Sequence, residues 1–227
     1  ELLANGSIDG FIMSLSTETQ QKSDYNHIKE VTDQGIPMVM FDRVTERIQC
    51  DKVVIDDAQG AFLAVKKFVE SGKKKIALIT TDDYLSVGKA RTDGYKKALA
   101  HYNIPLEESL ILKMPSMEVE ATAFDSFFKT QEVDAVLCVN EIFAMHAMRL
   151  VHGMNKRIPE DISFIGFTDG LLSKFAMPSL TAIAQHGELM GEEAARMLIE
   201  KVETESDEAT FTTTVLQPTL IERASTL

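Results

Sequence analysis

Apolar runs that no polar residue interrupts alternate with amphipathic segments along almost the whole chain. Strands without polar alternation are buried on both faces, which is typical of parallel strands covered by helices. Repeated β-α-β order with right-handed crossovers predicts a doubly wound α/β protein, although the pattern does not decide between one sheet and two. The expected strands are residues 8–13, 36–41, 53–55, 76–80, 110–112, 133–139 and 162–167, with short β segments at 212–216 and 219–222. The expected helices are residues 18–34, 59–71, 86–102, 119–129, 141–152 and 188–202.

The acidic charge of the chain argues against two classes of partner. The 227 residues include 23 Lys and Arg against 35 Asp and Glu, a formal net charge of −12. Nucleic acids and anionic membrane surfaces both attract basic faces, so we expect neither to bind this part of the protein directly. No run of about 18 apolar residues is present, as a membrane span requires. Cys50 and Cys138 form no CxxC pair, and we expect buried free thiols in a reducing compartment, the cytoplasm.

Polar side chains follow most of the expected strands at their carboxyl ends, where open α/β sheets bind ligands. They comprise carboxylates, hydroxyls and an amide, with the guanidinium of Arg91 nearby. Because each ligand hydroxyl both donates and accepts, this mixture favours a neutral ligand rich in hydroxyl groups. The same residue types also cap helix N-termini, which is the competing interpretation at any single position. The residues are Ser14, Ser16, Asp42, Arg43, Asp56, Asp57, Thr80, Thr81, Asp82, Asp83, Tyr84, Asn140, Glu141, Thr168 and Asp169.

Sequence templates for catalysis are missing from the chain. It contains no GxSxG, HExxH, GxGxxG or Walker A pattern. The five histidines show no metal-ligand spacing, and adjacent carboxylates such as Asp82 and Asp83 usually point apart in a loop. We therefore expect a protein that is not an enzyme, with no catalytic residues, no cofactor and no metal.

Two apolar groups are candidates for a dimer interface. Met145 and Met148 lie three residues apart on the expected helix 141–152, and flexible methionines suit irregular contacts. Leu171, Leu172 and Phe175 follow an expected ligand loop and are more apolar than a loop requires. Core packing is the alternative for both groups, and the sequence leaves it open.

Seven segments match the sequence pattern of one family in the same order. They are residues 8–13 (IDGFIM, against VDGIIL), 36–43 (IPMVMFDR, against IPVVxxDR), 54–61 (VIDDAQGA, against VxxDNxxGA), 91–99 (RTDGYKKAL, against RxxGYxxAL), 158–167 (IPEDISFIGF, against IPxDISVIGFD), 178–191 (PSLTAIAQHGELMG, against PxLTTIxQ…MG) and 222–226 (ERAST, the usual ending). The sequence thus resembles the effector-binding core of the LacI/GalR family of bacterial transcription regulators. Any one match is weak, but all seven in order are strongly specific.

The resemblance implies a periplasmic-binding-protein-like type I fold of two doubly wound parallel-sheet lobes joined by three crossovers. The N-terminal lobe would hold residues 1–58 and 184–206, and the C-terminal lobe residues 59–183 and 207–227. A small polar effector would sit in the cleft between the lobes. The family's helix-turn-helix domain and the first strand–helix–strand portion of the first lobe would precede residue 1.

Family positions carry over one residue at a time. Asp42 resembles an acidic ligand contact of the family, and Gln185 resembles a glutamine at the cleft edge. Arg91 resembles the arginine that binds ligand hydroxyls or carboxylates. Asn140 matches the Asn of the family's Asn-Asp pair, whereas Glu141 replaces the Asp.

A second departure falls in the same predicted pocket. Thr168 replaces the first Asp of the family's GFDD segment, a frequent ligand contact, while Asp169 keeps the second. The two departures imply an effector unlike the commonest sugars. Tyr84 and Phe143 are candidates for stacking on a sugar face, in a chain without Trp. The expected ligand-binding residues are Asp42, Asp82, Tyr84, Arg91, Asn140, Glu141, Phe143, Thr168, Asp169 and Gln185.

Three functions remain in competition at this stage. The favoured one is the effector-binding and dimerisation domain of a cytoplasmic transcription regulator of the repressor type. Its partners would be a sugar or sugar derivative, a second copy of the chain, and operator DNA bound through the preceding domain, with no membrane. A secreted sugar-binding protein of an ABC transporter would share the fold. An enzyme on a related fold is the least favoured, because no nucleophile–base set is apparent.

Overall fold

The computed structural model describes residues 8–204 and 210–227, which divide into two compact units. Of the described residues, unit 1 comprises 8–56, 84–87, 186–204 and 210–216, and unit 2 comprises 57–83, 88–185 and 217–227. The main chain therefore passes between the units at 56–57, 185–186 and 216–217, and residues 84–87 form a further short excursion. In that excursion, the backbone N–H and the hydroxyl of Ser86 donate to the side-chain oxygen of Gln20 in unit 1.

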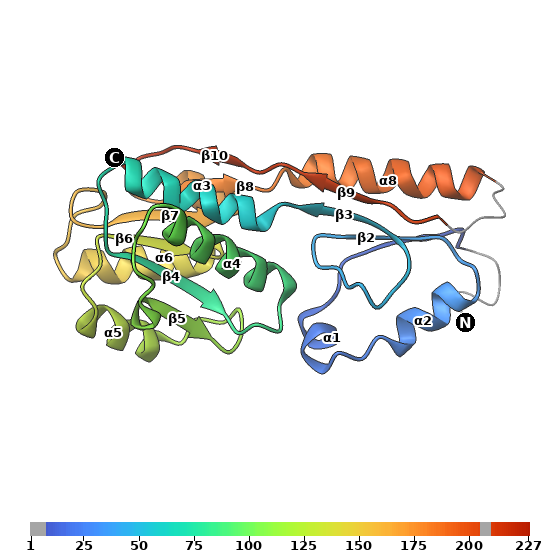
Figure 1. Ribbon diagram of the computed structural model, residues 1–227, viewed down its shortest axis with the longest axis horizontal. Coiled ribbons are helices and arrows are strands. Elements are labelled where there is room, and N and C mark those ends of the chain that lie inside the picture. Colours follow the sequence, from blue (N-terminus) through green and yellow to red (C-terminus); the bar gives the residue numbers. More distant parts are fainter. Residues whose placement is uncertain (1–7, 205–209) are drawn as a thin grey trace. The chain divides into compact units, whose positions relative to one another are not determined.

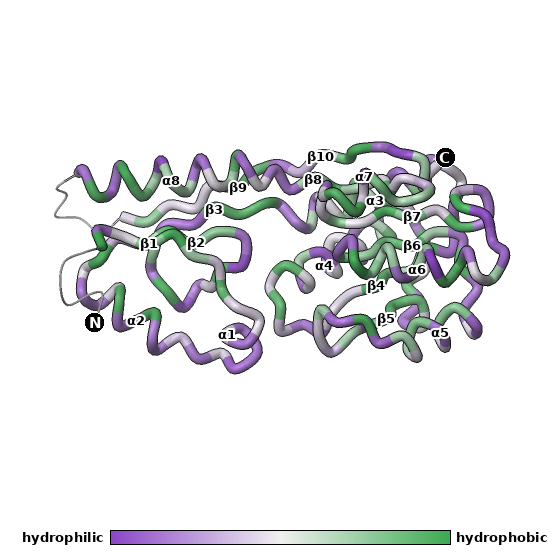
Figure 2. Tube along the Cα trace, turned by 180° about the vertical axis from the view of Figure 1, so that it is seen from behind, coloured by the Kyte–Doolittle hydropathy of each residue, from purple (hydrophilic) through white to green (hydrophobic). Residues whose placement is uncertain are grey.

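Unit 1 is a four-stranded parallel sheet with the strand order β1-β2-β3-β9. Helix α8 packs along one face through Met190, Ala194 and Met197, and Figure 2 shows its trace alternating between apolar and hydrophilic residues, as an amphipathic helix does. Leu15 and Ile28 belong to a second apolar cluster, beside α1 and α2. The elements are β1 (Phe11–Met13), α1 (Thr17–Lys22), α2 (Asn26–Asp33), β2 (Met38–Phe41), β3 (Asp51–Ile55), α8 (Gly187–Glu203) and β9 (Thr213–Leu216).

Unit 2 contains a six-stranded sheet with the order β10-β8-β7-β6-β4-β5 (Figure 1), in which only β10 runs antiparallel to its neighbour. Strands β4, β6 and β7 are buried along their whole length, as the unbroken apolar runs predict. The elements are α3 (Asp57–Glu70), β4 (Ile76–Thr81), α4 (Ser86–His101), the 3-10 helix η1 (Glu108–Leu110), β5 (Ile111–Met114), α5 (Ala121–Thr130), β6 (Ala135–Cys138), α6 (Glu141–Gly153), β7 (Ser163–Phe167), α7 (Leu171–Phe175), β8 (Thr181–Ala184) and β10 (Thr219–Ile221).

The C-terminal segment is built into unit 2. Ser225 is fully buried, and its hydroxyl donates to the carbonyl of Phe164 at 2.6 Å and accepts from the Thr181 N–H at 2.8 Å. The Phe164 N–H donates in turn to the Ser225 carbonyl. These bonds fasten residue 225 to strands β7 and β8, which makes the end of the chain part of the packed sheet.

The predicted α/β class with parallel-dominated sheets is confirmed, but three details of the prediction were wrong. The expected helix 18–34 is two helices, because Ser23 adopts a left-handed conformation with φ of 51° and ends α1. Strand β8 and the short helix α7 were not predicted as elements. We expected residues 207–227 in the C-terminal lobe, whereas β9 pairs with β3 in unit 1.

Candidate functional site

The carboxyl ends of four parallel strands meet at one edge of the unit 2 sheet. Strands β8, β7, β6 and β4 are successive parallel neighbours, so the residues that follow them lie along that edge. The structure thereby brings together four predicted ligand residues: Asp82 after β4, Asn140 after β6, Thr168 after β7, and Gln185 after β8. We name this set of strand ends and the residues that follow them the carboxyl edge of unit 2.

Arg91 reaches the carboxyl edge from helix α4. Its Nε donates to Asp57 Oδ1 at 2.7 Å, and its Nη1 donates to the carbonyl of Val139 at 2.6 Å. The guanidinium also lies over the ring of Phe167, with 4.0 Å between its central carbon and the ring centroid. Both side chains of the ion pair are buried, at 6% exposure for Arg91 and 7% for Asp57. Arg91 is therefore part of the floor of this edge rather than a free side chain.

Thr168 and Gln185 form a hydrogen-bonded pair at the ends of β7 and β8. The Thr168 hydroxyl donates to Gln185 Oε1 at 2.8 Å, and both residues are half-buried. Thr168 has a φ of 80°, a left-handed conformation that a β-branched residue rarely adopts. Its N–H donates to the Ile183 carbonyl, which holds this backbone in place. A hydroxyl and an amide are thus fixed side by side at the rim of the sheet.

Asn140 and Glu141 fulfil the helix-capping interpretation in this structure. Asn140 Oδ1 accepts from the Phe143 N–H at 2.7 Å and caps α6. The Glu141 carboxylate accepts from the backbone N–H and the hydroxyl of Ser173, at 3.3 and 3.1 Å. Gly170 lies so close that an added Cβ would be 2.5 Å from a Glu141 oxygen. The carboxylate of Glu141 therefore holds the beginning of helix α7.

Asp169 is engaged in ion pairs rather than pointing to an open edge. Its carboxylate accepts a hydrogen bond from Arg223 of the C-terminal segment, and Lys174 Nζ lies 3.9 Å away. Arg223 also donates to the Leu180 carbonyl at 2.8 Å. The second acidic residue of the family segment thus anchors the C-terminal segment beside α7.

Asp82 lies at the end of β4, and two further predicted ligand residues, Tyr84 and Asp42, belong to unit 1. Asp82 is exposed, and its N–H donates to the Met114 carbonyl at 3.0 Å. Tyr84 is half-buried in the segment that groups with unit 1. Asp42 follows β2 in unit 1 with a φ of 58°, and its carboxylate lies 3.6 Å from Arg43 Nε. All three remain predictions.

Two predicted roles do not fit the packing of helix α6. Phe143 is 0% exposed and packs edge-on against Phe124, with ring centroids 5.9 Å apart, so it presents no face to a sugar. Met148 is 5% exposed inside the same core, which excludes it from a surface contact in this structure. Met145 is half-buried and packs against that core. An inward-facing position on α6 explains the burial of Phe143 and Met148.

Helix α7 and the residue pair that follows it expose a group of large apolar side chains. Leu171 is 71% exposed, Phe175 82% and Met177 97%, and Leu172 is also exposed. Ser173, by contrast, is fully buried and bonded to Glu141. We name Leu171, Leu172, Phe175 and Met177 the α7 face. Several exposed apolar side chains so close together in the sequence are a candidate interaction surface.

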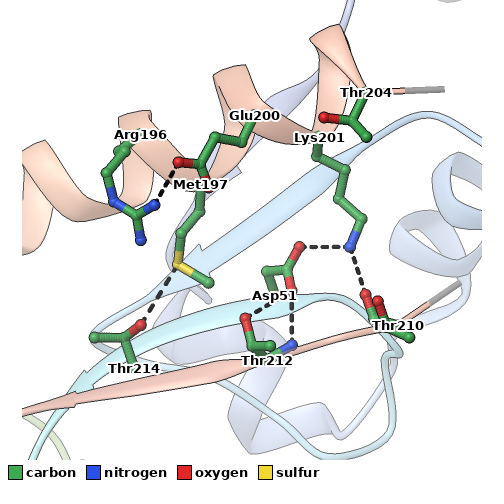
Figure 3. Close-up of a pocket in the computed structure, with 9 residues that line it drawn as sticks. All are labelled: Asp51, Arg196, Met197, Glu200, Lys201, Thr204, Thr210, Thr212 and Thr214. Carbon is green, nitrogen blue, oxygen red and sulfur yellow. Dashed lines mark hydrogen bonds and ion pairs between the residues drawn. The ribbon is translucent and has the colours of Figure 1, made fainter. Parts of the chain in front are cut away.

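A separate pocket lies in unit 1 between α8 and β9 (Figure 3), where the charged groups pair with one another. Lys201 donates to Asp51 Oδ2 at 2.6 Å and to the Thr210 carbonyl at 2.8 Å, and Arg196 donates to Glu200 at 2.6 Å. Asp51 Oδ1 also accepts from the Thr212 N–H. These contacts bind residue 212, just before β9, to the sheet.

Metal ligands and membrane spans were searched for within residues 8–204 and 210–227. No group of three or more His, Cys, Asp or Glu side chains in these ranges is placed to hold a metal ion. No helix in this part of the chain has the length and apolar character needed to cross a membrane. Cys50 and Cys138 are both buried free thiols.

Comparison with known proteins gives the chain its family. Residues 65–226 match the model described as "Periplasmic binding protein-like domain". The chain belongs to this family. It is 28% identical over 228 residues to the HTH-type transcriptional repressor PurR of Vibrio atlanticus, covering 99% of this chain and 66% of that protein. The chain thus spans less than two thirds of the length of the curated relatives that it matches first.

Solved structures of two regulators resemble this periplasmic binding protein-like domain across nearly its whole length. A complex of the transcriptional regulator CelR with cellobiose is 27% identical with a TM-score of 0.83, covering 98% of this chain and 67% of that one. A LacI family transcriptional regulator from Enterococcus faecium with bound ribose is 26% identical with a TM-score of 0.83, covering 99% and 81%. The predicted membership of the LacI/GalR group is therefore confirmed.

Sequence reasoning placed Asp57 among the polar residues at strand ends but did not predict its ion pair, and it missed Ser173 and Arg223, which also organise this domain's carboxyl edge. Asp57 carried a signal, because it stands where the family segment VxxDN has Asn. A carboxylate at that position needs a buried cation, and Arg91 is that cation. Ser173 and Arg223 gave no comparable signal, since only the tertiary structure brings them to Glu141 and Asp169.

Proposed function

We propose that this chain is the effector-binding part of a cytoplasmic bacterial transcription regulator of the repressor type. The effector is a small polar molecule, a sugar or a sugar derivative, that contacts the carboxyl edge of unit 2. The observation that carries the proposal is the cluster of hydroxyl, amide and guanidinium groups that four strands and α4 bring to that edge. The cellobiose and ribose in the two similar regulators support a sugar-type ligand.

Thr168 and Gln185 are the central recognition residues in this proposal. While the Thr168 hydroxyl donates to Gln185 Oε1, its oxygen can still accept from a ligand hydroxyl and the Gln185 NH2 can donate to one, and their mutual hydrogen bond holds both side chains in place. Asn140 and Asp82 lie on the same edge and extend the polar surface. Arg91 supports the edge from below through Val139 and Phe167. Asp42 and Tyr84 are further proposed ligand residues.

The ligand acts on DNA binding through linkage. It changes the affinity of the whole regulator for its operator only to the extent that it binds two arrangements of the protein with different affinity. A homodimer fits this role, and the α7 face offers exposed apolar side chains for a second copy. DNA contacts would belong to a separate helix-turn-helix domain, consistent with the net charge of −12 in this chain.

Ligand binding is the experiment that tests this proposal. We would screen sugars, sugar acids, sugar phosphates and purines by thermal shift, because a ligand at one hundred times its Kd adds about 2.7 kcal/mol of stability. Thr168→Val should weaken the best ligand about five- to tenfold, the equivalent of one lost hydrogen bond near 1 kcal/mol. Asp83→Asn is the matched control, because Asp83 is exposed and paired with Lys113.

Two results would contradict the proposal. One is a screen in which no compound shifts the melting temperature. The other is a ligand whose affinity Thr168→Val leaves unchanged, which would place binding away from the carboxyl edge.

A further inference from the structure

The buried ion pair between Asp57 and Arg91 places two opposite charges at the floor of the carboxyl edge. The Arg91 Nε and Asp57 Oδ1 atoms are 2.7 Å apart, and solvent reaches little of either side chain. Asp57 begins α3 and Arg91 lies on α4, so the two helices contribute one partner each. A guanidinium left alone in such a place would be a strong attractor for an anionic ligand. The carboxylate of Asp57 cancels that charge.

The position of the guanidinium makes this cancellation relevant to a ligand. Arg91 Nη1 donates to the carbonyl of Val139, the residue directly before Asn140, and the guanidinium plane lies against Phe167, the residue directly before Thr168. The charge pair therefore sits immediately beneath two of the residues that line the carboxyl edge. At this depth, solvent and salt screen it less than they would a surface pair.

Other charges near this edge do not favour an anion either. Asp82 is an exposed carboxylate, and Glu141 and Asp169 contribute carboxylates that face Ser173 and Arg223. A phosphate or carboxylate group at the edge would meet the exposed carboxylate of Asp82, without the attraction of an uncompensated Arg91. A neutral polyhydroxyl ligand needs only the donors and acceptors that Thr168, Gln185 and Asn140 supply.

We propose that Asp57 is a specificity-determining residue that restricts the ligand to neutral, hydroxyl-rich molecules by neutralising Arg91. This inference rests on the proposed function and narrows its ligand class, setting sugars against sugar acids and sugar phosphates. The family segment VxxDN has Asn at this position, and Asn would leave the guanidinium charge intact. Asp57 is thus a departure from the pattern that adds a negative charge directly beside Arg91.

The test is Asp57→Asn, which removes one charge and keeps the shape of the side chain. We would measure binding of ribose, ribose 5-phosphate and inorganic phosphate by calorimetry. The wild type should prefer ribose over ribose 5-phosphate and bind no inorganic phosphate. In Asp57→Asn the ratio of affinities should shift at least tenfold towards the phosphate ester, and inorganic phosphate should bind measurably.

Two further variants show whether the gain comes from Arg91. Asp57→Asn combined with Arg91→Met lacks both charges and should bind phosphate no better than the wild type, and Arg91→Met alone should behave in the same way. Because Asp57→Asn leaves a buried cation without its partner, its fold is checked by circular dichroism. If Asp57→Asn does not fold, the binding preference of the wild-type protein decides the test. The inference is overturned if the wild type prefers the phosphate ester, or if its affinity for ribose falls steeply with salt. It is supported if the wild type prefers ribose at all salt concentrations.

The outcomes separate the inference from the proposed function. If Asp57→Asn folds but gains no phosphate binding, the inference is wrong, even where a sugar binds the wild type. If the gain appears and the double variant loses it, the inference stands, even where no sugar binds and the proposed function fails.

Discussion

The carboxylate of Glu141, at the beginning of α6, accepts two hydrogen bonds from Ser173 in the middle of α7. Ser173 is the one fully buried residue of that five-residue helix, and its neighbours Leu172 and Lys174 are exposed. The contact fixes which side of α7 faces the protein. It therefore also fixes the outward direction of the α7 face.

Glu141→Ala should destabilise the protein by about 1 kcal/mol, in the range of a lost helix cap. The buried Ser173 N–H and hydroxyl would lose their acceptor, so the amide of Ser173 should exchange faster with solvent. Urea denaturation and hydrogen exchange measure the two effects. Glu132→Ala is the control, because its side chain is 91% exposed and should change stability little. Unchanged exchange at Ser173 would show that Glu141 does not hold α7.

Gly94→Ala should destabilise the protein by about 1–3 kcal/mol, as overpacking does. A Cβ at Gly94 would lie 2.1 Å from the carbonyl oxygen of Ala58, so α4 and α3 would have to separate. Gly191→Ala is the opposite control. Its Cβ meets nothing within 4 Å in helix α8, and alanine there should stabilise by about 0.5–1 kcal/mol. Denaturation midpoints that move in the same direction for both variants would contradict the packing argument.

Unit 2 should lose stability as the pH rises above the pKa of free tyrosine, which is about 10. Burial of Tyr95, with smaller contributions from Glu107 and Glu108, raises the pKa of its phenol, and the hydroxyl donates to the Ile76 carbonyl at 2.7 Å. The folded state therefore favours the neutral phenol. Its contribution is fully present below the unfolded pKa of about 10 and is lost above it.

Tyr95→Phe tests this pH dependence. The variant should be about 1 kcal/mol less stable at neutral pH because the hydrogen bond is missing. Its stability should then fall less than that of the wild type between about pH 8 and pH 11. Tyr102→Phe is the control, with a pH profile like that of the wild type. Parallel losses in the wild type and Tyr95→Phe would exclude Tyr95 as the cause.

Phe175→Asp should convert the proposed homodimer into a monomer. Phe175 belongs to the α7 face and is 82% exposed, and a charge placed in an apolar interface is costly to desolvate. Sedimentation velocity measures the change, with circular dichroism to show that the fold is intact. Leu106→Asp, at another exposed apolar position of unit 2, should leave the dimer unchanged. If Phe175→Asp remains dimeric, the interface lies elsewhere.

The sequence predicted the strands of unit 2 well because their apolar runs are long and uninterrupted. It failed at β8 and α7, where the TAIA strand and a five-residue helix are too short for a clear period. It also could not place β9, since the pairing with β3 depends on contacts such as that of Asp51 with Thr212, far apart in sequence.

The candidate site shows the same limit. Strand ends predicted that Asp82, Asn140 and Thr168 would share an edge, because parallel strands present their carboxyl ends together. Gln185 was expected only from the family resemblance, because β8 was not predicted as a strand. Residue type alone could not tell that Phe143 faces the core or that Arg91 is paired with Asp57. Those outcomes depend on the rotation of α6 and the packing of α3 against α4.

The burial of Ser225 against Phe164 and Thr181 has a consequence for biosynthesis. A ribosome releases residues 57–185 well before residues 217–227, and the segment synthesised between them, 186–216, belongs to unit 1. The sheet of unit 1 likewise lacks its last strand until β9 has been synthesised. Neither unit can therefore finish folding early in translation, in the domain-by-domain order that is usual for consecutive domains. In the nascent chain, the hydrogen bonds of β7 and β8 to residue 225 stay unformed until the last segment emerges.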